Sequence, residues 1–333
     1  MTRRTNKQTS TRARIAAAAA RLMAEDGIDD FALAKRKAAK QLGALESQAL
    51  PGNDEIEAEL RAYLALYQAD EHPQRIVELR AIALDAMATV GEDIDPYFSR
   101  FKSLGLSSAH LKRIPGQFTA QGFITTDLDN NQITNFHPGA MNFSHENRIG
   151  SALGAKVAII GPDGKLGMVE HARQCAEQRI SFLFDPGQGL PMFSGEELAE
   201  FIRLADYVAV NDYEGKLLQE KTGRSLQDIS HDVKALIFTR GAEGSTILAG
   251  GQRHEIACVE ADKVVDPTGC GDAYRAGLLY GIVHGWDWPA TGRLGSVMGA
   301  IKIAHRGGQN HAPAREEIEA RFRRAFGYSP WKG

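Results

Sequence analysis

Four short apolar runs, separated by helical patterns, constrain the fold more than any other feature of the chain. The runs are AKVAII, ISFLFD, DYVAVND and KALIFTRG, which lie within residues 155–241. Ser194 and Glu197 predict a capping box at the start of one intervening helix. Strands that alternate with helices form a mainly parallel sheet covered on both faces. We therefore expect a doubly wound α/β fold.

A β-hairpin is predicted before this region. The segment GQFTAQGFITTDLDNNQITNFHPGAM contains two alternating patterns on either side of Asp129, Asn130 and Asn131. Alternation that flanks a cluster of turn-forming residues is typical of a hairpin. We expect the two strands to lie between Phe118 and Phe136.

The first 87 residues have a different composition from the rest of the chain. Only three of the 34 glycines (Gly27, Gly43 and Gly52) precede residue 88. The segment is rich in Ala, Lys, Arg and Glu, and its apolar residues recur at helical spacing. We expect three or four helices that follow a disordered basic tip.

Charge and cysteine usage exclude several classes of protein. The net charge of -3 gives the whole molecule no field that would attract a polyanion. The three cysteines form no CxxC pair, which favours a reducing compartment. The apolar run near the N-terminus is too short for a signal peptide or a membrane span. We therefore expect a soluble, cytoplasmic protein without a membrane partner.

The segment VVDPTGCGDAYRAGLL, residues 264–279, predicts a strand end, a tight loop and a helix. Gly269 and Gly271 let the backbone approach an anion, and the first helical turn offers unpaired N–H groups. Asp272 opposes phosphate binding, so it needs another role: it could take a proton from a hydroxyl that attacks the bound phosphoryl group. The alternative is that Asp272 caps the helix and the glycines form a plain turn.

Two more loops follow predicted strands. VNDYEGKLL places Asn211 and Glu214 at a strand end, and FTRGAEGS places Thr239, Gly241 and Gly244 at another. Ligands of open α/β sheets bind at the carboxyl ends of the strands, and an acid with an amide suits a magnesium–phosphate shell. Either loop alone could be an ordinary polar turn. Together with the loop at residues 266–272, they favour a phosphate site at one edge of the sheet.

The three loops resemble those of the ribokinase-like (PfkB-type) sugar and nucleoside kinases. The family carries a DTxGAGD-type loop, which reads DPTGCGD here, with Cys270 where Ala is usual. The resemblance covers about residues 88–328, and the loops follow the family's order. The segments FHPGAM and GGQNHAP look closest to bacterial adenosine kinase-like members.

The resemblance implies a role for each loop. Asp272 would be the catalytic base, bordering the ATP phosphates, and the amides of Gly269, Cys270 and Gly271 would form the anion hole. Asn211 and Glu214 would organise Mg²⁺ and phosphates, and the remaining loop (Thr239, Gly241 and Gly244) would contact ATP. Asp266 and Thr268 match positions that hold a monovalent cation, such as K⁺, in some members. The hairpin, about residues 115–140, would be a lid over the acceptor.

The chain departs from the family before the segment MATVGEDIDPYF. Members begin with a strand, an acceptor-binding acid and a Gly-Gly loop, none of which is visible in residues 1–87. We therefore expect a helical segment at 1–87, joined near Met87 to a kinase domain at 88–330 that lacks its usual first strands. The ATP half of the site would be intact, and the acceptor half incomplete, so that activity is impaired.

Two functions remain open. The first is ATP-dependent phosphoryl transfer to a small sugar or nucleoside. The second is a nucleic-acid-binding or regulatory protein with an inert kinase remnant, since part of residues 1–45 resembles the first helices of TetR-type regulators. The recognition-helix pattern is absent, and the near-neutral charge favours a solvated helix face for the basic cluster. That cluster consists of Lys35, Arg36, Lys37 and Lys40. A homodimer is compatible with either function.

Overall fold

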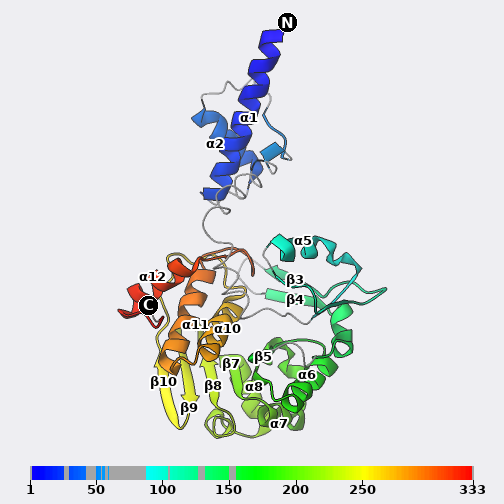
Figure 1. The fold of residues 1–333 in the computed structure, drawn as a ribbon, viewed down its shortest axis with the longest axis vertical. Helices are drawn as coiled ribbons and strands as arrows, with labels where there is room; N and C mark the ends of the chain where they lie inside the picture. The colour runs from blue at the N-terminus through cyan, green and yellow to red at the C-terminus, as the bar shows by residue number, and fades with distance from the viewer. Residues whose placement is uncertain are drawn as a thin grey trace. The chain divides into compact units, whose positions relative to one another are not determined.

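The computed structural model describes residues 2–25, 30–42, 50–53, 55–56, 59, 88–103, 106–126, 132–149 and 155–331. The chain divides into two compact units, Met1–Arg75 and Ile76–Gly333 (Figure 1). Each unit has its own buried core and is described by itself.

The N-terminal unit is built on two helices, α1 (Thr2–Glu25) and α2 (Phe31–Gln41). Its core consists of Ile15, Ala16, Ala19, Ala20, Ala34, Ala38 and Ile56. The Asp30 carboxylate caps α2 by accepting from the Ala32 amide at 2.7 Å. The predicted disordered tip is wrong, because α1 begins at Thr2 and the alanine-rich helix extends through the basic residues, which are good helix formers. The other helices expected before residue 88 fall largely outside the described residues.

The larger unit is centred on a six-stranded sheet with the order β10-β9-β8-β7-β6-β5. Strands β5 to β8 are parallel, and β9 and β10 continue the sheet antiparallel. The strands are β5 (Val157–Ile160), β6 (Ser181–Phe184), β7 (Tyr207–Asn211), β8 (Ala235–Thr239), β9 (Ser245–Ala249) and β10 (Gln252–Ile256). The four predicted apolar runs are thus the four parallel strands.

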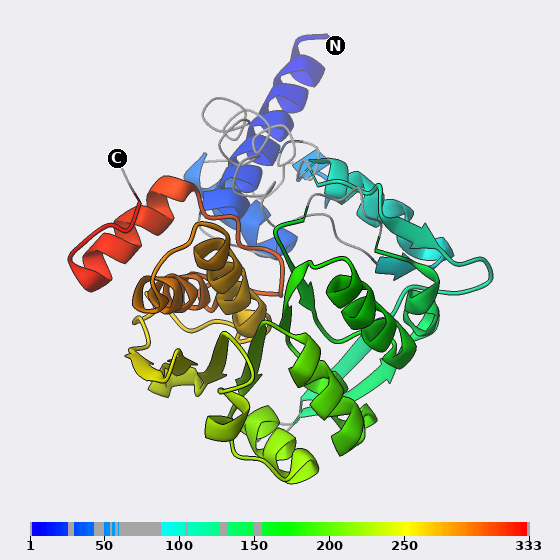
Figure 2. The same cartoon turned by 60° about the horizontal axis from the view of Figure 1, so that its bottom comes forward.

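Helices cover both faces of this sheet (Figure 2). On one face, Phe182 and Phe184 pack in a core with residues of the helices that connect the parallel strands. The residue between them, Leu183, faces the other core, where it joins Tyr274 of α10. The connecting helices are α6 (Lys165–Glu177), α7 (Gly195–Leu204), α8 (Asp212–Thr222) and α9 (Leu226–Ile229), with the short turns η4 (Gly187–Met192) and η5 (Gly241–Glu243). The doubly wound fold and the capping box at Ser194 are both confirmed.

Three helices follow the sheet in sequence: α10 (Cys270–Val283), α11 (Trp288–Lys302) and α12 (Arg315–Phe326). The backbones of α10 and α11 come very close, since a Cβ on Gly277 would lie 2.6 Å from the Gly295 amide nitrogen. Residues Leu294 and Ile301 of α11 bury against Ile318 and Phe322 of α12. A Cβ on Gly299, near the end of α11, would lie 3.8 Å from the Cys270 carbonyl oxygen, so the end of α11 lies beside the start of α10.

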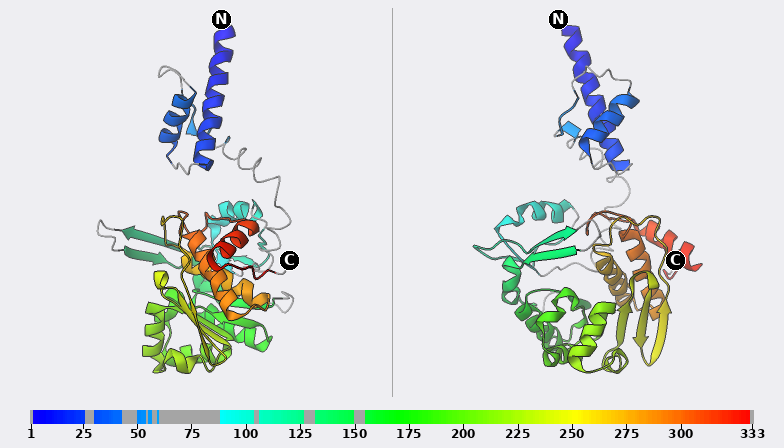
Figure 3. Two further views of the ribbon diagram at one scale, coloured as in Figure 1. Left: turned by 90° about the vertical axis from the view of Figure 1, so that its left-hand side faces the viewer. Right: turned by 180° about the vertical axis from the view of Figure 1, so that it is seen from behind.

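A smaller substructure precedes the sheet. It contains β1 (Ala88–Val90), η1 (Glu92–Ile94), α5 (Asp95–Ser103), β2 (Leu111–Arg113), β3 (Gln121–Thr126), β4 (Gln132–His137) and η2 (Gly139–Glu146). Strands β3 and β4 are antiparallel with Thr126 opposite Gln132, so the predicted hairpin is confirmed, although its turn lies outside the described residues. Figure 3 shows the hairpin projecting from the unit. Phe123 and Phe136 on it are each more than half exposed.

The strand expected at Val264 and Val265 is not formed. The described chain from 257 to 269 is irregular, and Val264 is 76% exposed. The amides of Val265 and Asp266 both donate to the Ile303 carbonyl just beyond α11, at 2.9 and 3.1 Å. These backbone groups therefore pair with a helix end and not with the sheet. Among the helices of the described residues, none is long and apolar enough to cross a membrane.

Candidate active site

The loop DPTGCGD leads directly into the first turn of α10. Gly269 is the N-cap, with φ of +81°, a conformation that favours glycine. A glycine has no side chain with which to cap, and Asp272 lies three residues later inside the helix, so the interpretation of Asp272 as the N-cap is wrong. The Cys270 amide donates to the Pro267 carbonyl at 3.1 Å. Among the described residues, no acceptor faces the amides of Gly269, Gly271 and Asp272.

Asp266 ties this loop to the segment that follows α11. Its carboxylate accepts from the Thr268 amide at 2.9 Å and from the Gly307 amide at 2.7 Å. These two hydrogen bonds, followed by one from the Thr268 side chain, lower the pKa of Asp266 to about 2. A Cβ on Gly269 would lie only 3.2 Å from the Gly308 Cα, so the two segments are in close contact.

Asn211 and Glu214 form a capping box at the start of α8. The Asn211 side chain accepts from the Glu214 amide at 2.8 Å, and the Glu214 carboxylate accepts from the Asn211 amide and from Asn211 Nδ2, at 2.9 and 2.8 Å. Glu214 is 7% exposed, and its burial raises the pKa of its carboxyl above the ordinary value. The alternative of an ordinary exposed polar turn therefore does not hold for Glu214, which is buried in a capping box.

The third loop begins beside the second. Thr239 is the residue of β8 that stands opposite Asn211 of β7 in the parallel register. Gly241 and Gly244 both have positive φ, +54° and +84°. A Cβ on Gly244 would lie 2.2 Å from the Ile256 carbonyl oxygen, so packing against β10 already requires glycine there. At Gly241 a Cβ would meet nothing within 4 Å.

A buried ion pair that sequence reasoning missed links α10 to Asp185 and to the first turn of α8. Arg275 of α10 donates to both carboxylate oxygens of Asp185, each at 2.8 Å, and its Nη2 lies 3.8 Å from Glu214 Oε2. All three side chains are less than a tenth exposed. Burial raises the pKa of Asp185 despite the opposing effect of Arg275, and although burial would lower the pKa of Arg275, Asp185 and Glu214 keep it raised. The sign of this ion pair that the sequence offered was Asp185, the acid that ends the ISFLFD run.

Asp272 lies on α10 close to this ion pair. Asp272 and Arg275 are three residues apart, so they lie on the same side of α10. The charge of Asp272 affects both Asp185 and Arg275. A Cβ on Gly271 would lie 3.1 Å from Arg275 Nη1, so this glycine leaves room for the guanidinium. Arg275 thus joins the helix that carries Asp272 to Asp185, just after β6, and to the first turn of α8.

The described residues contain no group of three His, Cys, Asp or Glu side chains arranged to hold a metal ion. Ionised, the cluster of Asp185, Glu214, Asp272 and Arg275 carries three negative charges and one positive charge. A net charge of this sign attracts a cation. Mg²⁺ in nucleotide sites is commonly held by one or two carboxylates, waters and the substrate's phosphates. The site fits that kind of shared coordination.

Comparison with known proteins identifies the family. A sequence model of the pfkB family of carbohydrate kinases matches residues 79–315. The chain belongs to the pfkB family. It is therefore a kinase, and the loops described above lie within the matched residues.

Nucleoside kinases are prominent among the similar pfkB-family proteins. The nucleoside kinase of Methanocaldococcus jannaschii is 31% identical over 240 residues, which are 72% of this chain and 79% of that protein. A structure of the Burkholderia thailandensis nucleoside kinase in complex with inosine is 53% identical with a TM-score of 0.74, covering 77% of this chain and 85% of that one. Its structure with ADP-inosine is 56% identical, with a TM-score of 0.71 over 73% and 77% of the two chains. The ribokinase-like fold is thereby confirmed.

Proposed function

We propose that this pfkB-family chain transfers the γ-phosphoryl group of ATP to a hydroxyl of a nucleoside, with inosine as the first candidate. The observation that carries the proposal is the start of α10, where an acid stands beside amides that have no acceptor among the described residues. The similarity to a nucleoside kinase whose structures contain inosine and ADP-inosine supports the choice of acceptor and donor. An adenosine preference is a narrower hypothesis within this proposal.

Asp272 is proposed as the general base. Its carboxylate would take the proton from the acceptor hydroxyl as the oxygen attacks the γ-phosphorus and the bond to the ADP oxygen breaks. The amides of Gly269 and Gly271, together with the positive end of α10, would stabilise the negative charge of the phosphoryl group in flight. The Cys270 amide already donates to the Pro267 carbonyl, so it would act by closing the turn that presents the other two amides to the phosphoryl group. This division of roles is sufficient, because phosphoryl transfer depends mostly on positioning and charge neutralisation.

The nucleotide side is assigned to the loops after β7 and β8. Mg²⁺ would neutralise charge on the phosphates of ATP. Glu214 would reach it through water, because both of its oxygens already accept from Asn211. Thr239 and Gly241 are proposed to contact ATP beside Asn211, and Gly244 shapes the same turn.

The acceptor side is proposed to be incomplete, with the β3–β4 hairpin as its lid. Strand β5 ends the six-stranded sheet, and no strand of the described residues pairs with its outer edge. Ile159 on this strand is 41% exposed. Phe123 and Phe136 on the hairpin are each more than half exposed. Exposed apolar groups at these places support a partly uncovered acceptor side and slow turnover.

A kinase assay tests the function directly. The full chain, with ATP and Mg²⁺, is given inosine, adenosine, ribose or fructose, and the phosphorylated product is measured by mass spectrometry. We expect slow transfer to the nucleosides and less to the sugars. A preference for ribose or fructose would contradict the nucleoside assignment. Transfer to none of the four above the background of the Asp272→Asn variant would contradict the kinase proposal for this chain.

Asn211→Ala is expected to weaken ATP·Mg²⁺ binding about tenfold, because a hydrogen bond to the buried Glu214 carboxylate is lost. Calorimetry measures the dissociation constant. The matched control is Ser225→Ala, which removes the capping box of α9. Ser225 follows the far end of α8, a helix about 16 Å long. Both variants lose a cap worth about 1 kcal/mol. Equal ATP affinities in the two variants would remove Asn211 from the nucleotide site.

A further inference from the structure

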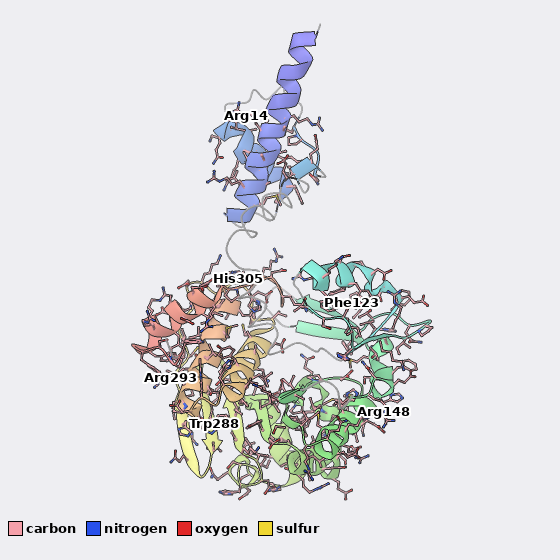
Figure 4. The ribbon with its side chains drawn as sticks, viewed as in Figure 1. Arg14, Phe123, Arg148, Trp288, Arg293 and His305 are labelled. Carbon is pink, nitrogen blue, oxygen red and sulfur yellow. The ribbon has the colours of Figure 1, made fainter. Side chains whose placement is uncertain are left out.

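Lys302 is a fully buried lysine at the last position of α11. Its ammonium donates to two backbone carbonyls, those of Asp266 and His305, both at 3.0 Å. Figure 4 labels Trp288 and His305 near the two ends of α11, with the lysine's end on the His305 side. Lys302 thus joins the end of this helix to the loop that begins at Asp266 and leads into α10.

The surroundings of Lys302 are those of a bound cation. The hydrogen bonds of its ammonium go to the Asp266 and His305 carbonyls, and its charge helps to lower the pKa of the Asp266 carboxyl in the same loop. Burying an unpaired charge is costly unless dipoles solvate it. Backbone carbonyls at the C-terminal end of a helix supply such dipoles, because the negative end of the helix dipole lies there. A charged nitrogen held by carbonyl oxygens takes the place that a monovalent ion would take.

The expectation of a separate monovalent cation at Asp266 and Thr268 does not fit these contacts. The Asp266 carbonyl already accepts from Lys302, and its two carboxylate oxygens accept from the amides of Thr268 and Gly307. Burial raises the pKa of the Cys270 thiol in the same loop, and the charge of Lys302 opposes that rise. A K⁺ ion on the same oxygens would meet the ammonium's charge at short range and be repelled.

We propose that Lys302 is a built-in cation that replaces a bound monovalent ion and holds the loop at residues 266–271 against the segment after α11. Lys302 is a positioning residue: it acts through the Asp266 carbonyl on the loop that leads to Asp272. The chain therefore needs no K⁺. The inference relies on the proposed function only for what the positioned loop does, since the lysine and its carbonyl partners are structural features of the unliganded protein.

Melting temperatures in matched salts test this proposal without an activity assay. The wild-type protein is compared in KCl, NaCl and choline chloride at equal ionic strength, and we expect the same melting temperature in all three. Lys302→Ala removes the ammonium and opens space for an ion. We expect its melting temperature to fall by about 5 °C or more in choline chloride, because buried carbonyls lose their donor, and to recover in part in KCl or ammonium chloride.

Lys302→Met is the matched control. Its side chain has a similar length and fills the space, so we expect the same loss of stability with no recovery in KCl. Direct binding of Rb⁺ by equilibrium dialysis should follow the same order: binding to the Ala variant, and none to wild type or the Met variant. Selective stabilisation of the wild type by K⁺ would overturn the proposal. An Ala variant that is indifferent to the cation, or that fails to fold in every salt, would also overturn it.

The melting curves do not depend on phosphoryl transfer. A negative kinase assay would therefore contradict the proposed function without contradicting the role of Lys302. If both hold, the Ala variant should also acquire a K⁺ requirement for ATP·Mg²⁺ binding that the wild type lacks. The Met variant should bind ATP·Mg²⁺ equally well in KCl and choline chloride.

Discussion

Asp272→Asn is expected to lower the rate of phosphoryl transfer to inosine by about 10²–10⁴-fold, because a positioned base contributes about that much. The amide of Asn has nearly the same shape as the carboxylate, and the N-cap of α10 is Gly269, so no cap is lost. The melting temperature and the affinity for ATP·Mg²⁺ should therefore stay close to those of the wild type. The measurement is kcat with saturating ATP, beside a melting curve and calorimetry on the same preparation.

Asp212→Asn is the matched control for Asp272→Asn. Asp212 is an exposed acid in the first turn of α8, so this variant also removes a negative charge near a helix N-terminus. The proposal assigns no proton transfer to it, and we expect its rate to remain within a few-fold of the wild-type rate. Full activity in Asp272→Asn, or an equal loss in the two variants, would exclude Asp272 as the base.

Arg275→Met is expected to destabilise the kinase unit by about 3–5 kcal/mol, because removing one partner leaves buried, uncompensated charge. Asp185 would lose both of its hydrogen bonds from the guanidinium, and Glu214 would lose its nearest cation. For a unit of this size the melting temperature should fall by about 10 °C. Urea unfolding monitored by circular dichroism measures the free energy.

The loss in Arg275→Met should depend on pH. Burial already raises the pKa of Asp185 and Glu214 above their ordinary values of 3.8 and 4.5, and without Arg275 they would rise further. A folded-state pKa above the unfolded one makes ionisation of the folded protein costly, so the penalty is largest at high pH and is relieved as the carboxylates protonate. We expect the difference from wild type to be smaller at pH 5 than at pH 8.

Arg173→Met provides the matched control for Arg275→Met. Arg173 forms a bidentate pair with Glu200 on the surface, at 2.9 and 3.0 Å, with about half of its side chain exposed. Exposed pairs contribute about 0–1 kcal/mol, so the same substitution should have little effect there. A comparable small loss for both arginines would contradict the structural role assigned to the buried pair.

Local patterns predicted the elements correctly wherever the chain's own neighbours determine the structure. The apolar runs became β5 to β8, and the clustered turn residues separated β3 from β4. The prediction for Val264 and Val265 was wrong, because two valines are typical of a strand only when a sheet edge is available. Here their segment lies against the end of α11, and the Ile303 carbonyl accepts its backbone hydrogen bonds. The sequence contains no local sign of this pairing.

The three loop motifs were visible in the sequence because each is a few contiguous residues, and their order within the chain indicated the family. The sequence did not show which atoms of each loop form hydrogen bonds or packing contacts. The motif at Asn211 and Glu214 is a buried capping box, and Gly244 is required by the Ile256 carbonyl. These are packing constraints, and they depend on neighbours that the motif does not contain.

The sequence by itself determined the fold class, the pfkB-type loops and the placement of Asp272 at the start of a helix, because these follow from periodicity and short-range spacing. Only the tertiary structure joined Asp185 to Arg275 across 90 positions, and Lys302 to Asp266 across 36. Both contacts bury a cation among oxygens contributed by distant segments. A charge becomes decisive for stability and position only when folding removes it from water, and that burial is a property of the packed chain.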